Sequence, residues 1–350
     1  MRKTLPPFDG RFDHELFAPI MPYDQGYLEL DGDTRLYYEQ AGNEKGPVAL
    51  YLHGGPGAGL NAVHWRYFDP EVYRIIQFDQ RGAGKSRPHA RSLLNLERNR
   101  TDQLCEDIEA LRAHLGIERW LIMGGSWGTT LALAYAQSQP ERVTALILRS
   151  LYMGSKAEIE HFFTGLPVYF PEAFARFIKK LMALSGLKIV PKKTEDILAA
   201  ALELLCPNLP LDEEKCAKQE AMAQAWVQYE FACSRLKLSK EIAQDMQRFD
   251  NAQQNTALAI LEAQYMAHHC FLEPQALAQN MMRLADIPIV LLQGRHDVLC
   301  PPKIAWDLAQ DNPNIMLRVI ENAAHSLYDR PLRVACVGAA HYCQRYFLNR

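Results

Sequence analysis

The chain has 350 residues, a net charge of −3, 48% apolar residues and 23% charged residues. These values are typical of a globular protein with a sizeable core, and without a long basic run they argue against nucleic acid as a partner. No stretch approaches the roughly 18 uninterrupted apolar residues of a membrane helix, and residues 1–10 lack the apolar core of a signal peptide, so we expect a cytoplasmic protein without membrane contact.

The first half of the chain predicts strands that alternate with helices. A hairpin is expected over 27–38, because apolar and polar residues alternate on both sides of Asp31-Gly32. Continuous apolar runs at 48–52 and 74–78 predict strands that are buried on both faces. The helix expected next has its apolar positions at Leu104, Ile108, Leu111 and Leu115, with Gly116 at its end. Strand, helix and strand follow over 120–148.

The pattern changes after residue 150. Up to residue 284 the sequence predicts helices separated by prolines, and strands return only at 287–292 and 316–320. A last helix is expected over 332–347. We therefore predict an α/β fold with a mostly parallel sheet, helices on both faces and an all-helical cap inserted before the last two strands.

This pattern divides the chain into two predicted domains. Residues 1–150 and 285–350 would form the core, and residues 151–284 would form the cap. Because ligands of open α/β sheets bind outside the carboxyl ends of the strands, we expect the cap to cover the site there.

The segment 124–128, GGSWG, carries the strongest chemical signal. Four apolar residues precede it and a helical run rich in Ala and Leu follows it. A G-x-S-x-G turn between strand and helix holds its serine in a strained conformation above the sheet edge. The sequence therefore predicts Ser126 as a catalytic nucleophile. The simpler interpretation is a glycine-rich turn whose serine has no function.

A serine hydroxyl needs a base to remove its proton and a third group to orient that base. Asp297 comes directly after the strand expected at 287–292, and His325 follows the strand expected at 316–320. Both are therefore predicted at the same sheet edge as Ser126, in the chain order Ser, Asp, His that this turn usually accompanies. The alternative for Asp297 is a turn or helix-capping residue.

Attack on a carbonyl creates an oxyanion, which needs preorganised N–H donors. We expect one from the backbone of Trp127 and the other from Gly55, with Gly54 beside it, because these glycines follow the strand at 48–52 and let the backbone approach a substrate. The segment 84–86, GKS, resembles the end of a phosphate-binding loop. Asp79 stands where that loop needs its first glycine, so no nucleotide site is predicted. Residues 79–82 are expected instead to brace the nucleophile turn through charged hydrogen bonds.

Neither the cysteines nor the histidines predict a metal site. The eight cysteines are scattered without a C-x-x-C pair, so we expect free, mostly buried thiols. His268, His269 and Cys270 are adjacent, but neighbours on a helix point about 100° apart and no partner cluster accompanies them. We predict no metal and no other cofactor.

Several motifs together resemble one family. These are HGGPG at 53–57, FDQRGAGKS at 78–86, GGSWGTTLALAY at 124–135, GRHD at 294–297 and AHS at 324–326. They are similar to the motifs of the proline iminopeptidases, serine peptidases with the α/β-hydrolase fold. The resemblance extends from about residue 26 to the end of the chain. It implies that the substrate is a peptide with a free N-terminal proline.

The resemblance also implies which cap residues bind the substrate. The segments 225–230 and 261–266 resemble the two cap helices that carry glutamates in this family, so Glu230 and Glu262 are expected to hold the amine of the substrate. Tyr152 and Phe162 are expected to form the pocket for the proline ring. For a single glutamate or aromatic residue of a helix, the ordinary alternatives are a solvated surface and a packed core.

Other functions remain compatible with the same core. A carboxylesterase or amidase would cleave acyl esters faster than proline arylamides, and a receptor built on this fold would bind its ligand without turnover. An epoxide hydrolase or dehalogenase is disfavoured, because those relatives carry Asp at the position of Ser126. The sequence leaves open how strictly proline is preferred, the preferred peptide length and the oligomeric state.

Overall fold

The computed structural model describes residues 15–237 and 252–348. Within these residues, eight strands form one sheet in the order β1-β2-β4-β3-β5-β6-β7-β8. The strands are β1 (Asp24–Glu29), β2 (Arg35–Gly42), β3 (Val48–Leu52), β4 (Arg74–Phe78), β5 (Trp120–Ser126), β6 (Val143–Leu151), β7 (Ile289–Gly294) and β8 (Ile315–Ile320). The sheet begins as an antiparallel hairpin and continues as a parallel sheet from β4 to β8.

The predicted strands are confirmed, with shifts of one to four residues at several of their ends. The hairpin pairs Leu28 with Leu36 across its two strands. Strand β6 continues to Leu151, beyond the predicted residue 148. Strand β7 begins at Ile289, two residues later than predicted, because Pro288 has no N–H for the ladder, and it ends at Gly294 opposite Ile320.

Helices cover both faces of the sheet. Ile122 and Met123, successive residues of β5, lie in two separate apolar clusters, as side chains of one strand alternate between faces. The first cluster includes α1 (Thr101–His114), α2 (Trp127–Ser138) and α10 (Pro302–Asp311). The second includes α11 (Arg330–Cys343) and a 3-10 turn over Ala62–Tyr67. The last helix thus starts and ends earlier than predicted and continues as a π-helical turn over Gln344–Leu348.

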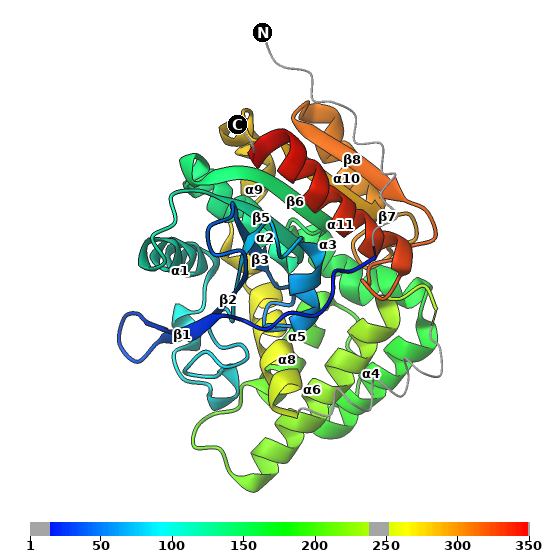
Figure 1. The fold of residues 1–350 in the computed structure, drawn as a ribbon. Coiled ribbons are helices and arrows are strands. Elements are labelled where there is room, and N and C mark those ends of the chain that lie inside the picture. Colours follow the sequence, from blue (N-terminus) through cyan, green and yellow to red (C-terminus); the bar gives the residue numbers. More distant parts are fainter. Residues whose placement is uncertain (1–14, 238–251, 349–350) are drawn as a thin grey trace.

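All regular elements described between β6 and β7 are helical. The α-helices are α3 (Lys156–Glu160), α4 (Pro171–Ser185), α5 (Thr194–Leu205), α6 (Glu213–Cys233), α8 (Ala252–Ala267) and α9 (Ala276–Gln279). In Figure 1, α4, α5, α6 and α8 gather on one side of the sheet. They enclose an apolar core of their own, which contains Phe163, Phe177 and Trp226.

Helix α8 connects this helical layer to the end of the sheet where β5 meets α2. The ring of Tyr265 lies edge-on against the Trp127 indole at 4.7 Å between centroids, and its hydroxyl donates to Asn99 at 2.8 Å. The cap therefore covers the turn that carries Ser126. Residues 1–14 of the predicted core and 238–251 of the predicted cap lie outside the described residues, and the boundaries of the two domains stay a prediction.

Candidate active site

Ser126 occupies a strained turn between β5 and α2. Its φ of 55° and ψ of −127° lie in a region that side chains other than glycine rarely adopt. The flanking glycines make this turn possible. A Cβ on Gly124 would lie 2.2 Å from the carbonyl oxygen of Gly128, and a Cβ on Gly128 would lie 2.4 Å from that of Leu52. The start of α2 can therefore press directly onto β3 and β5.

Asp297 and His325 form a hydrogen-bonded pair after β7 and β8. The Nδ1 atom of His325 lies 3.0 Å from Oδ2 and 3.3 Å from Oδ1 of Asp297, whose side chain is buried. The backbone N–H of Cys300 donates to Oδ1 at 2.8 Å, and the amide of Gln293 donates to Oδ2 at 3.2 Å. With these donors in place, the carboxylate is fixed in the position that orients the imidazole.

Ser126 and His325 line one pocket, called the outer pocket below. Among the described residues, no hydrogen bond joins the Ser126 hydroxyl to the His325 imidazole. Such bonds are often long in unliganded hydrolases and shorten when substrate binds. The structure thus brings the three predicted side chains to one edge of the sheet and leaves their catalytic roles a prediction.

The predicted oxyanion donors lie beside Ser126. Gly54 and Gly55 also line the outer pocket, and a Cβ on Gly54 would lie 3.5 Å from the Ser126 Cβ. Gly55 has a φ of +107°, which requires glycine. Trp127 is the first residue of α2, so its N–H has no acceptor within the helix. Both backbone segments can therefore direct N–H groups at an oxygen bound to Ser126.

A buried glutamine, Gln80, links these two segments. Its Nε2 donates to the carbonyl of His53 at 2.9 Å, and its Oε1 accepts from the Trp127 indole at 3.0 Å. Its backbone N–H donates to Nε2 of His53 at 3.1 Å. Burial lowers the pKa of His53 to about 4, so this imidazole is neutral and can accept. Gln80 thus holds the loop before Gly54 at a fixed place relative to the start of α2.

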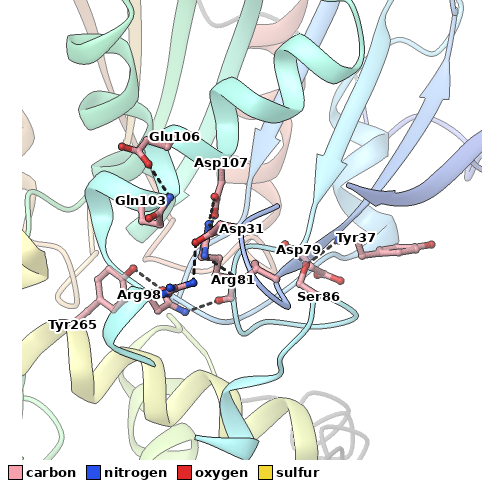
Figure 2. A network of polar contacts seen from close by, with 12 residues as sticks. Asp31, Tyr37, Asp79, Arg81, Ser86, Arg98, Gln103, Glu106, Asp107 and Tyr265 are labelled. Carbon is pink, nitrogen blue, oxygen red and sulfur yellow. Dashed lines mark hydrogen bonds and ion pairs between the residues drawn. The ribbon is translucent and has the colours of Figure 1, made fainter. Parts of the chain in front are cut away.

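The charged residues of the same motif have their partners elsewhere, so the predicted charged hydrogen bonds to the nucleophile turn were wrong, whereas the neutral Gln80 does contact it. Arg81 forms a bidentate pair with Asp107 of α1, at 2.6 and 2.7 Å, and contacts Asp31 of the hairpin turn at 2.9 Å (Figure 2). Asp79 accepts from the backbone N–H groups of Leu60 and Lys85. Its own carboxylate therefore occupies the loop that resembles a phosphate site.

Glu230 of α6 and Glu262 of α8 meet in a second pocket, called the inner pocket, which Ser126 also lines. Burial and the nearby Glu230 charge raise the pKa of Glu262 well above its ordinary value. Burial also raises the pKa of Glu230, opposed by His325 and by a hydrogen bond from Glu262. Glu262 therefore holds the proton and donates to Glu230. The indole of Trp226 donates to Oε2 of Glu262 at 2.6 Å.

Tyr152 and Phe162, predicted for the proline ring, line the inner pocket beside the two glutamates. Phe162 stacks on Trp226 with 5.7 Å between ring centroids. Further residues of the lining were not singled out from the sequence: Pro56, Glu158, Tyr265, Met266, Cys270, Leu299 and Cys300. A signal existed for Tyr265 and Met266, which belong to the cap segment that carries Glu262. None existed for Cys270, whose neighbours His268 and His269 are exposed.

The described residues also bear on metal binding and on membrane insertion. Within residues 15–237 and 252–348, no three His, Cys, Asp or Glu side chains are grouped so that they could hold a metal ion. No helix in the same residues has the length and apolar character needed to cross a membrane.

Comparison with known proteins places the chain in a family. A family model for the alpha/beta hydrolase fold matches residues 47–330. Proline iminopeptidase from Xylella fastidiosa (strain Temecula1 / ATCC 700964) is 41% identical over 316 residues, which cover 90% of this chain and 94% of that protein. Proline iminopeptidase from Arabidopsis thaliana is 38% identical, covering 89% of this chain and 77% of that protein.

Solved structures agree on the fold. Haloalkane dehalogenase DbeA from Bradyrhizobium elkani USDA94 is similar with a TM-score of 0.58 and 20% identity, covering 92% of this chain and 98% of that chain. A putative lipase from Acinetobacter baumannii is similar with a TM-score of 0.55 and 16% identity, covering 92% and 91%. These likenesses are to the fold alone. The fold, the family model and the extended identity together show that this chain belongs to the proline iminopeptidase family of α/β hydrolases.

Proposed function

We propose that the protein is a serine exopeptidase that releases proline from the N-terminus of peptides. The observation that carries this proposal is the place of Ser126, which borders both the inner pocket with its paired glutamates and the outer pocket with His325. A prolyl residue whose amine lies in the inner pocket would present its carbonyl to Ser126 and its leaving peptide to the outer pocket.

The reaction follows from the roles of the three side chains. The Ser126 oxygen bonds to the carbonyl carbon while its proton passes to Nε2 of His325, and Asp297 stabilises the imidazolium through Nδ1. N–H groups of Trp127 and Gly55 stabilise the oxyanion. The C–N bond then breaks, and His325 returns the proton to the leaving amine. Water, deprotonated by His325, hydrolyses the prolyl ester and restores Ser126.

The glutamate pair supports selection of a free amine. A buried ammonium needs a carboxylate partner, and against the larger effect of burial the hydrogen bond from Glu262 lowers the pKa of Glu230 and so favours its ionised form. Aromatic side chains beside the pair, Tyr152 and Phe162, suit the small apolar ring of proline. An N-acylated proline has no positive charge and would leave the pair without its ion partner.

The test compares proline 4-nitroanilide, N-acetylproline 4-nitroanilide and 4-nitrophenyl butyrate. We expect turnover of the first substrate, and at least a 100-fold lower kcat/KM for the second. Ser126→Ala should reduce proline arylamide turnover by more than 10⁴-fold with an unchanged circular dichroism spectrum. Faster cleavage of the butyrate ester than of the proline arylamide would favour an esterase, and turnover that survives Ser126→Ala would refute the mechanism.

A further inference from the structure

Arg149, near the carboxyl end of strand β6, is a buried cation without an anionic partner. Its side chain is more than nine-tenths buried, and it lines the outer pocket with Ser126 and His325. Its Nη1 donates to the backbone carbonyl of His325 at 2.8 Å, and its Nε has no acceptor. In the described part of the chain no carboxylate forms an ion pair with it. A buried charge of this kind is costly unless a ligand compensates it.

The polar residues around Arg149 are neutral. Burial raises the pKa of Tyr51 to about 12, against the opposing effect of the Arg149 charge. Burial lowers the pKa of His64 to about 3 and that of His53 to about 4. All three side chains line the outer pocket. They can solvate a bound anion or the guanidinium, but none of them supplies the missing negative charge.

The guanidinium also lies directly beside the nucleophile turn. A Cβ on Gly125 would lie 2.1 Å from Nη2 of Arg149, so this nitrogen contacts the residue before Ser126. Arg149 does not line the inner pocket, whereas Glu230 and Glu262 do. The two pockets that meet at Ser126 therefore differ in charge. Among the described residues, the inner one is lined by glutamates without a cation, and the outer one combines Glu230, which lines both pockets, with the Arg149 cation at its wall.

We propose that Arg149 binds the C-terminal carboxylate of a short leaving group, so that the preferred substrates are zwitterionic dipeptides of the form Pro-Xaa. This inference rests on the proposed exopeptidase function and names its substrate class. A guanidinium matches a carboxylate through two parallel N–H···O bonds. In a dipeptide the carboxylate is one residue beyond the scissile bond, a reach of about 3.8 Å between Cα atoms, which suits a cation in contact with Gly125.

Arg149 could instead act only on the protein, by holding the His325 loop through the carbonyl contact. The two roles have different consequences. A positioning role affects every substrate that Ser126 attacks. A carboxylate site affects only substrates that have a carboxylate, and it does so mainly through KM.

The experiment compares Pro-Gly, Pro-Gly amide and proline 4-nitroanilide. In the wild-type protein we expect kcat/KM for Pro-Gly to exceed that for Pro-Gly amide by about 10- to 100-fold, the range of charge-assisted hydrogen bonds. The leaving amine of the amide is the less basic one, so intrinsic reactivity does not produce this preference. Arg149→Met should bring the ratio to about 1, chiefly by raising KM for Pro-Gly, and Arg149→Lys should keep part of it.

Arg119→Met is the matched control. Arg119 also donates to a backbone carbonyl, that of Val143, but it lies before β5 at the opposite edge of the sheet, so this variant should keep the wild-type ratio. Equal losses on all three substrates in Arg149→Met would assign Arg149 to the His325 loop and overturn the proposal. A wild-type ratio of 1 would overturn it even if the variant does not fold. Proline 4-nitroanilide has no carboxylate, so its turnover tests the exopeptidase function separately.

Discussion

Replacement of Glu262 by Gln tests the electrostatics of the glutamate pair in the folded protein. Glu262 is 2% exposed, accepts from the Trp226 indole and donates its proton to Glu230. A glutamine has the same shape and can do the same: its carbonyl oxygen accepts from the indole and its NH₂ donates to Glu230. Glu262→Gln therefore keeps the hydrogen bonds and removes one titration.

The sign of the effect follows from the direction of the pKa shift. Because the folded-state pKa of Glu262 lies above its ordinary value of 4.5, the folded protein binds this proton more tightly than the unfolded chain does. Its contribution to the free energy of unfolding is therefore lost as pH rises from 4.5 towards the folded-state pKa, by about 1.4 kcal/mol per pH unit. The glutamine has no such loss, so the variant should gain stability over the wild type across this window.

The assay is denaturant unfolding of both proteins at half-unit steps from pH 4.5 to pH 8. We expect the stability difference to be smallest at pH 4.5, to grow with pH and then to level off. Glu203→Gln, an exposed glutamate of α5, controls for the same replacement elsewhere in the cap. A stability difference between the two proteins that is constant over this range, or that grows as pH falls, would refute the conclusion that Glu262 holds the proton of the pair.

The remaining predictions concern the catalytic machinery and its support. Asp297→Asn should lower kcat for proline 4-nitroanilide by about 10³- to 10⁴-fold with little change in KM, because the wrong imidazole tautomer is then favoured; an unchanged kcat would separate Asp297 from catalysis. Gln80→Leu leaves the Trp127 indole N–H and the His53 carbonyl without their partners, so it should cost about 2–5 kcal/mol of stability. It should also lower kcat for proline 4-nitroanilide more than it raises KM. Equal effects on KM and kcat would argue against a role of Gln80 at the oxyanion donors. Gly128→Ala should lose more than about 3 kcal/mol of stability in denaturant unfolding, because its Cβ meets the Leu52 carbonyl. The control Gly116→Ala should lose about 1–2 kcal/mol, because a Cβ there has no atom within 4 Å and only the φ of +64° is unfavourable. Similar losses in the two variants would contradict the close approach at Gly128.

Much of the fold could be predicted because its signals are local. The central strands are parallel and buried on both faces, so they appear in the sequence as uninterrupted apolar runs such as 48–52 and 74–78. The nucleophile turn was predictable because Gly124 and Gly128 have neighbours that exclude any Cβ. Asp297 and His325 could be predicted from their places after two strands, since the carboxyl ends of parallel strands share one edge.

The charged motif at 79–82 shows where local signals fail. Its position after β4 suggested a brace for the nucleophile turn, and the neutral Gln80 does contact that region. Arg81 points instead to Asp107 and Asp31, which come from α1 and from the hairpin turn. The choice between these partners depends on how α1 packs against the sheet, and residue spacing within the motif has no information on that packing.

The wall of the inner pocket depends on the same kind of long-range packing. The backbone angle φ is near +50° at His269, Cys270 and Phe271. These residues are in the left-handed conformation, and none of them is a glycine that would indicate this in the sequence. Tertiary contacts hold this turn: the Cys270 carbonyl accepts from Thr101 of α1 at 2.5 Å, and Phe271 lies edge-on against Tyr265 at 5.1 Å. The turn brings Cys270 into the pocket lining, near the hydroxyl of Tyr152 at 3.8 Å. The shape of the proposed proline pocket is therefore set by contacts of this turn with α1, with α8 and with Tyr152 after β6, so residues far apart in sequence determine it together.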